Sequence, residues 1–174
     1  MTWGRRSSTD ERRVKSAKSD GPEPTAYQRA LGLLVRREHS RKELGRKLVA
    51  KGVEREDLDL ALDKLRRQDF QNDARFASAL ARSRSSSGYG PARIRAELAT
   101  HGLSREEIAA AIEACERDWD DSAREIIARR FGNKDLDNPD LRRKAVDFLL
   151  RRGFEQKSAF MAVRARPGDE TAFD

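Results

Sequence analysis

The 174-residue sequence predicts an all-α protein of three tandem three-helix repeats in an elongated, curved arrangement. The chain matches itself at an offset of 50 residues and again at a further offset of 51. Apolar residues recur four apart, as on one face of a helix, and no segment shows the alternation typical of a strand. Three copies at such a period are typical of a repeat architecture.

The three copies resemble one another at one glycine and at the apolar positions around it. In copy one these positions are Leu44, Leu48, Gly52, Val53, Leu58 and Leu62. In copy two they are Ile94, Leu98, Gly102, Leu103, Ile108 and Ile112. In copy three, the weakest, they are Ala145, Leu149, Gly153, Phe154, Ala159 and Val163. The three glycines suit the left-handed position that ends a helix, so we expect each to close the second helix of its copy.

Each copy is expected to contain three helices. The first is amphipathic, and its apolar residues are Leu31, Leu34 and Val35 in copy one, Phe76, Ala77 and Leu80 in copy two, and Ile126, Ile127 and Phe131 in copy three. The second begins near Ser40, Pro91 or Pro139, residue types that suit a helix start. The third follows the glycine and its apolar neighbour, and Ser104 with Glu107 has capping-box spacing, as Ser40 with Glu43 has for a second helix.

These elements predict five segments along the chain. They are a disordered basic arm at 1–24, repeats at 25–68, 69–116 and 117–166, and a polar tail at 167–174. The arm has no apolar period and buries too little surface to offset its ordering entropy. It either attracts phosphates or serves as a passive solubilising tail.

Composition narrows the function classes. The chain has 37 Lys and Arg against 30 Asp and Glu, a net charge of +7, and 39% charged residues, which favours an anionic partner. Only 37% of residues are hydrophobic, so the core must be thin or divided. No apolar run approaches the ~18–20 residues of a membrane span and no signal segment is visible, so we expect a cytoplasmic protein without membrane contact.

No catalytic motif is visible, and we expect neither an enzyme nor a metal or cofactor site. The acid pairs Glu106-Glu107 and Asp120-Asp121 are interpreted as helix-start carboxylates. The single cysteine, Cys115, is interpreted as a small core residue, and His101 as a surface residue at a helix end. Trp119 is expected to pack between copies two and three.

Basic residues repeat on the second helices and predict one long basic track for a phosphate backbone or an acidic filament groove. The predicted track residues are Arg41, Lys42, Arg46, Lys47, Arg82, Arg84, Arg93, Arg95, Arg142, Arg143, Lys144, Arg151 and Arg152. The segment 82–90 is expected to be a flexible loop. The alternative is a solvated face interspersed with acids such as Glu43, Glu97 and Asp147.

The joint between copies one and two carries a specific motif. It contains Phe70-Gln71-Asn72-Asp73-Ala74-Arg75-Phe76-Ala77, then Gly90-Pro91-Ala92-Arg93-Ile94, Glu97-Leu98 and Gly102-Leu103. Over about residues 26–165 the chain resembles the RecX family, the bacterial regulators of RecA recombinase. Gln68-Asp69 stands where that family often has a glycine, which predicts that the preceding helix continues through these positions.

The resemblance implies tandem three-helix repeats that bind in the groove of the RecA filament on single-stranded DNA. It further implies that the protein restrains ATP hydrolysis, strand exchange and filament growth during DNA repair, recombination and the SOS response. We expect a monomer, and direct DNA contact stays open. The alternatives are a nucleic-acid-binding helical repeat protein that acts without a filament, and a helical scaffold for an acidic protein partner.

Overall fold

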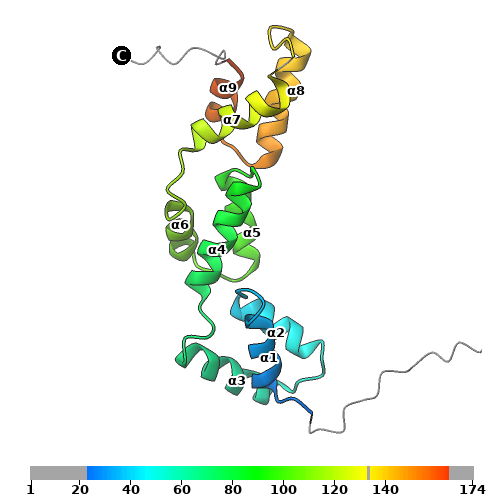
Figure 1. Ribbon diagram of the computed structural model, residues 1–174, viewed down its shortest axis with the longest axis vertical. Helices are drawn as coiled ribbons and strands as arrows, with labels where there is room; N and C mark the ends of the chain where they lie inside the picture. The colour runs from blue at the N-terminus through cyan, green and yellow to red at the C-terminus, as the bar shows by residue number, and fades with distance from the viewer. Residues whose placement is uncertain (1–22, 133, 165–174) are drawn as a thin grey trace, which may run out of the picture.

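The computed structural model describes residues 23–132 and 134–164, and within them it is all-helical, with nine α-helices and no strand. The helices are α1 (Ala26–Leu34), α2 (Arg41–Val49), α3 (Arg55–Arg67), α4 (Asp73–Ser86), α5 (Pro91–Thr100), α6 (Arg105–Glu113), α7 (Trp119–Phe131), α8 (Pro139–Arg152) and α9 (Gln156–Arg164). Each consecutive triplet packs mainly on itself, and the three triplets stack into an elongated column (Figure 1). The predicted fold class is confirmed. Most of the predicted arm and all of the predicted tail lie outside the described residues.

Local capping chemistry sets the helix boundaries. Pro91 and Pro139 occupy the first positions of α5 and α8, where proline loses no helical hydrogen bond. Ser104 and Glu107 form the predicted capping box in full. Ser40 accepts a hydrogen bond from the backbone of Glu43, but the Glu43 carboxylate binds Arg37 instead of returning to Ser40, so half of that predicted box is wrong.

The repeats enclose three separate small cores. Each core is centred on the predicted apolar positions of its second helix, and Leu44, Ile94 and Leu149 are fully buried. Trp119 contacts the cores of the second and third repeats, as expected, and Cys115 packs against the core of the second. The division into three cores explains how a chain with so few hydrophobic residues buries its apolar side chains.

Three local predictions are wrong. Val35 is 81% exposed because α1 ends at Leu34 and the next residue turns away from the core. The segment beginning at Arg82 is not a loop, since α4 continues to Ser86. The helix before Phe70 does not continue either, because Asp69 adopts a left-handed conformation with φ of 55°. Aspartate tolerates this region better than most residues, so it replaces the glycine of the tighter turn.

The second helices of the three repeats lie end to end. Glycines end these helices as predicted, and Gly52, Gly102 and Gly153 have φ of 77°, 81° and 88°. At the joint between repeats two and three, the carbonyl oxygens of Arg152 and Gly153 accept hydrogen bonds from the amides of Gly90 and Ala92, at 2.8 and 3.0 Å. The unpaired carbonyls at the end of α8 therefore satisfy amides at the start of α5.

Side chains make the corresponding joint between repeats one and two. Asp73 accepts a hydrogen bond from the first amide of α2, at 2.9 Å, and the Ser40 hydroxyl lies 2.9 Å from Nδ1 of His101. The His101 ring also packs against Phe76, with ring centres 4.7 Å apart. His101 caps the end of α5, as predicted, but it is half-buried in the joint and not a free surface residue.

Candidate binding surface

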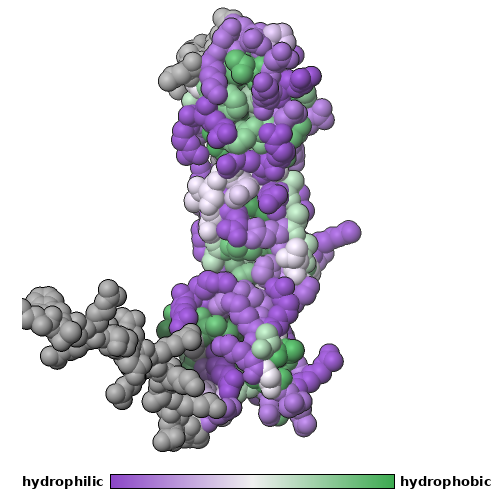
Figure 2. Space-filling view, turned by 90° about the vertical axis from the view of Figure 1, so that its right-hand side faces the viewer, coloured by the Kyte–Doolittle hydropathy of each residue, from purple (hydrophilic) through white to green (hydrophobic). Residues whose placement is uncertain are grey.

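The end-to-end helices carry basic residues along the length of the column, but on more than one face, since Arg93 lies beside Tyr89 and Arg95 lines a hollow next to Trp119. In Figure 1, α2, α5 and α8 follow the right-hand side, while α6 and α9 lie to their left. Figure 2 views this right-hand side directly and shows mostly hydrophilic residues, with hydrophobic ones in small separate areas. The Lys42 side chain crosses to the next repeat, since a Cβ added at Gly102 would stand 3.4 Å from its Cδ atom.

Seven of the thirteen predicted track residues are exposed cations without an ion-pair partner among the described residues. They are Lys42, Arg46, Arg82, Arg93, Arg95, Lys144 and Arg151. They come from all three repeats, and all but Arg82 lie on second helices. An exposed cation that is not neutralised by a neighbouring carboxylate remains available to an anionic partner.

Five predicted track residues are instead engaged by carboxylates. Arg84 is held most firmly, because Glu97 accepts two hydrogen bonds from its guanidinium at 2.8 and 2.7 Å. The pKa of Glu97 is lowered mainly by this contact. The other engaged residues are Arg41 with Asp63, Lys47 with Glu43, Arg142 with Asp137 and Arg143 with Asp140. The expected interspersion of acids therefore applies to part of the track.

Arg152 lies inside the joint and not on the track. One of its terminal nitrogens donates hydrogen bonds to the carbonyl oxygens of Ser87 and Gly88, both at 3.0 Å. Its guanidinium carbon lies 5.3 Å from the ring centre of Tyr89 and 4.8 Å from that of Phe148. Arg152 is therefore half-buried and not among the exposed cations, and its predicted part in binding stays a prediction.

Further cations and rings extend this cluster on both sides. Arg93 lies 5.5 Å from the Tyr89 ring centre, and Arg130 lies 4.7 Å from the Phe148 ring centre. Lys134 lies 5.2 Å from the Phe131 ring, which meets Phe148 edge to face. We call the set Arg93, Tyr89, Arg152, Phe148, Arg130, Phe131 and Lys134 the cation–ring ladder. Sequence reasoning missed its rings, Arg130 and Lys134.

Part of the ladder has a local sequence signal. Phe148 and Arg152 are four residues apart on α8, a spacing that brings side chains together on a helix, whereas Tyr89 precedes the first turn of α5 and meets Arg93 from outside the helix. No such signal connects Arg130 to Phe148, because they belong to different helices. That contact follows only from how α7 packs on α8.

A buried acidic group lies beneath the basic residues of the first repeat. Burial raises the pKa of Glu43, but hydrogen bonds from Arg37, His39 and Lys47 outweigh burial and lower that pKa to about 2. Burial lowers the pKa of His39, which is 2% exposed and whose Nδ1 lies 3.0 Å from a Glu43 oxygen. These contacts hold the start of α2 in place in repeat one.

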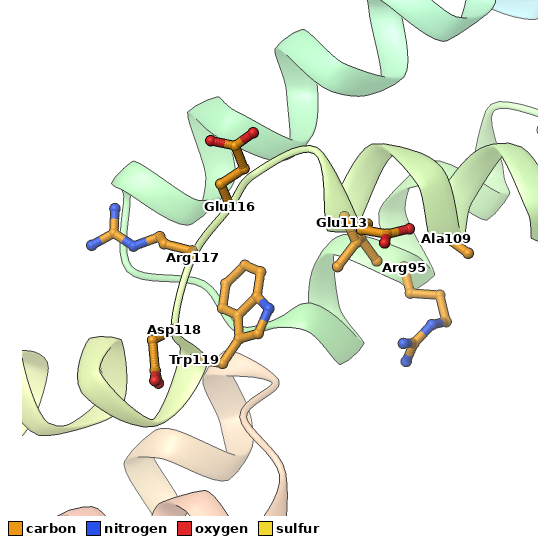
Figure 3. Close-up of a pocket in the computed structure, with 8 residues that line it drawn as sticks. Arg95, Ala109, Glu113, Glu116, Arg117, Asp118 and Trp119 are labelled. Carbon is orange, nitrogen blue, oxygen red and sulfur yellow. The ribbon is translucent and has the colours of Figure 1, made fainter.

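A hollow on the surface lies beside Trp119. It has a volume of about 480 Å³ and is lined by carboxylates and arginines from α5, α6 and the segment before α7. Figure 3 shows Glu116 and Asp118 projecting in opposite directions away from the Trp119 ring. Burial raises the pKa of the nearby Cys115 thiol, which makes it a poor nucleophile.

Two further features are absent among the residues that the structure describes. No cluster of three or more His, Cys, Asp or Glu side chains in this part of the chain is suited to a metal ion. None of its helices combines the length and the apolar composition that a membrane span requires.

Fold and surface together define a class: an all-helical repeat protein that presents a row of unpaired cations from end-to-end helices. Family models for the three three-helix domains of RecX match the chain in sequence order. The first domain matches residues 26–65, the second 72–112 and the third 116–159. The chain belongs to the RecX family, as its central motif indicates.

Relatives support this membership over most of the chain. "Regulatory protein RecX" of Xanthomonas axonopodis pv. citri (strain 306) is 56% identical over 142 residues, which are 82% of this chain and 88% of the relative. The protein of the same name from Stenotrophomonas maltophilia (strain R551-3) is 54% identical over 147 residues, or 84% of this chain and 90% of the relative.

Solved structures share the fold. The crystal structure of RecX from Lactobacillus salivarius matches with a TM-score of 0.63 at 20% identity, over 79% of this chain and 92% of that one. A crystal structure of regulatory protein RecX matches with a TM-score of 0.64 at 23% identity, over 79% of this chain and 69% of that one.

Proposed function

We propose that this protein regulates the RecA recombinase by binding along the RecA–DNA filament. Binding mainly inhibits ATP hydrolysis, filament growth and strand exchange. The observation that carries the proposal is the row of unpaired cations on three end-to-end helices, since a long anionic groove requires charges distributed over many ångströms. Membership in a family whose members are named regulatory proteins supports the same function.

The proposal assigns no chemistry to the protein itself. It acts as a cytoplasmic monomer that changes the activity of its partner. Because the row of cations belongs to all three repeats, each repeat contributes part of the contact and none suffices alone.

The test measures the ATPase activity of RecA on single-stranded DNA with the purified protein added below stoichiometry. We expect inhibition by the wild type and weaker inhibition by a variant with Lys42, Arg46, Arg93 and Arg95 replaced by Ala. Exposed charges contribute little stability, so this variant should fold.

The matched control replaces Arg55, Arg66, Arg67 and Arg105 by Ala. These residues are equally exposed, but they lie on the third helices α3 and α6, away from the row. The control removes the same number of charges and should inhibit like the wild type. Unchanged RecA activity at every ratio of wild-type protein to RecA would overturn the proposal.

A further inference from the structure

We propose that the cation–ring ladder is a binding site for the sugar–phosphate backbone of a nucleic acid strand at the joint between repeats two and three. This inference deepens the proposed function, because it names the component of the filament that this part of the surface contacts. It adds Arg130 and Lys134 to the surface and gives the joint itself a ligand.

The ladder concentrates cations without neutralising them. Arg93, Arg130, Arg152 and Lys134 have no carboxylate within ion-pair distance among the residues described by the structure. Glu97, one turn along α5 from Arg93, is already bound by Arg84. The ladder ends at Lys134, since Asp135 and Asp137 follow it.

The rings fix the arginines in orientations suited to phosphate. A guanidinium that stacks on an aromatic face keeps its N–H groups at the edge, where they can donate to anionic oxygens. Arg93 and Arg130 are both exposed and lie at opposite ends of the Tyr89–Arg152–Phe148 series. Each is held by a ring at one face, so less side-chain freedom is lost when a phosphate binds.

The rings themselves are occupied, which excludes base stacking as the main contact. Tyr89 has both Arg93 and Arg152 within 5.5 Å of its centre. Phe148 has Arg130 and Arg152 within 4.8 Å and meets the edge of Phe131. Proteins that hold single strands by stacking present free aromatic faces. The ladder is therefore expected to bind by charge, without regard to base sequence.

The test measures the fluorescence anisotropy of labelled oligonucleotides with the full chain and without RecA. We expect equal affinity for a 20-nucleotide oligo-dT and for an abasic strand of the same length, within about twofold, because phosphates carry the binding. Replacing Arg130 and Lys134 by Ala should weaken both roughly tenfold at low salt and reduce the salt slope by about 1.4, since each lost contact to a single strand contributes about 0.7.

The matched control replaces Lys157 and Arg164 by Ala. Both are exposed cations of the same repeat, but they lie on α9. The control should bind like the wild type. A 20-base-pair duplex is measured with the same Arg130 and Lys134 variant. If the variant loses affinity for the single strand alone, the ladder binds single-stranded backbone, and if it also loses affinity for the duplex, the ladder binds both forms. Either result supports the site.

Three outcomes would overturn the inference. The first is an Arg130 and Lys134 variant that binds like its control, and the second is an abasic strand that binds much more weakly than oligo-dT. The third is a polyglutamate peptide that binds as tightly as oligo-dT and loses the same affinity in the variant, which would make the ladder a site for acidic protein. Because RecA is absent, these results stand apart from the ATPase test of the proposed function.

Discussion

Burial alone would raise the pKa of Glu43, yet its contacts with Arg37, His39 and Lys47 bring that pKa down from 4.5 to about 2. A carboxyl whose pKa is lower in the folded state stabilises that state at any pH above its unfolded value. The stabilisation is lost as the pH falls from about 4.5 to about 2, and its full size is on the order of 3 kcal/mol.

We therefore predict that Glu43→Gln flattens the acid limb of the stability profile. The wild type should lose free energy of unfolding between pH 4.5 and 2, and the variant should lose clearly less over the same range, although it is less stable at pH 7. Urea denaturation at several pH values measures both. Glu56→Gln, at an exposed position of α3, is the control and should keep the wild-type slope. Parallel profiles for wild type and Glu43→Gln would contradict the prediction.

At the scale of single residues, the sequence predicted the features that depend only on neighbouring residues in the chain. The left-handed glycines and the helix-start prolines follow from backbone sterics, and both are confirmed. Arg151 and Arg152 show what could not be predicted from local sequence. They are neighbours in sequence and were assigned the same role, but Arg152 enters the joint while Arg151 is exposed. Only the position of another repeat distinguishes the two.

At the scale of helices, the joint between α8 and α5 depends on two glycines that leave no room for side chains. A Cβ at Gly90 would lie 2.5 Å from the carbonyl carbon and oxygen of Gly153. Gly90 has φ of −83°, which any residue adopts, so the constraint there is steric and not conformational. Sequence reasoning identified Gly153 as a helix end but had no means to pair it with Gly90, 63 residues earlier.

We predict that Gly90→Ala destabilises the protein by about 1–3 kcal/mol, the usual cost of adding a group to a filled site. The matched control is Gly32→Ala, because Gly32 lies in α1 with nothing within 4 Å of its Cβ position. That substitution should stabilise the protein by up to about 1 kcal/mol through helix propensity. Urea denaturation compares them. Equal effects of the two substitutions would show that the joint is loosely packed.

The candidate binding surface was also predictable only in part. Periodicity placed the cations on the outer faces of the second helices, because apolar positions four apart define the inner face. It did not show which cations have acid partners, since Arg84 meets Glu97 across two helices and Arg41 meets Asp63. The ladder was missed for the same reason, as its central contacts join α8 to Tyr89 of the neighbouring repeat and to α7.

Over the whole molecule, the two joints differ in kind. Backbone hydrogen bonds and a close glycine contact join repeats two and three. Polar side chains join repeats one and two, among them His101 and the buried group around His39. Stacked repeats share stability through such interfaces, so conditions that weaken one joint separate the column there.

Acid should weaken the joint between repeats one and two first. Burial lowers the pKa of His101, opposed by Glu43 and Glu97 and assisted by Lys42 and Arg46. Burial likewise lowers the pKa of His39, opposed by Glu43 and assisted by Arg37 and Lys47. A histidine with a lowered pKa is kept neutral in the folded state, and once released it binds a proton below about pH 6.5. Stability at this joint is therefore full above pH 6.5 and decreases as the pH falls.

Spin-label distances measure this asymmetry directly. With Cys115→Ala as background, labels at Asp59 and Ala110 span the joint between repeats one and two, and labels at Ala110 and Lys157 span the other. We predict that the first distance distribution broadens between pH 7.5 and 5.5 while the second stays unchanged. Replacing His39 and His101 by Asn should remove most of the response, because no other group at this joint has its pKa lowered from that range. Equal broadening at both joints would show that acid loosens the repeats themselves and not the contact between them.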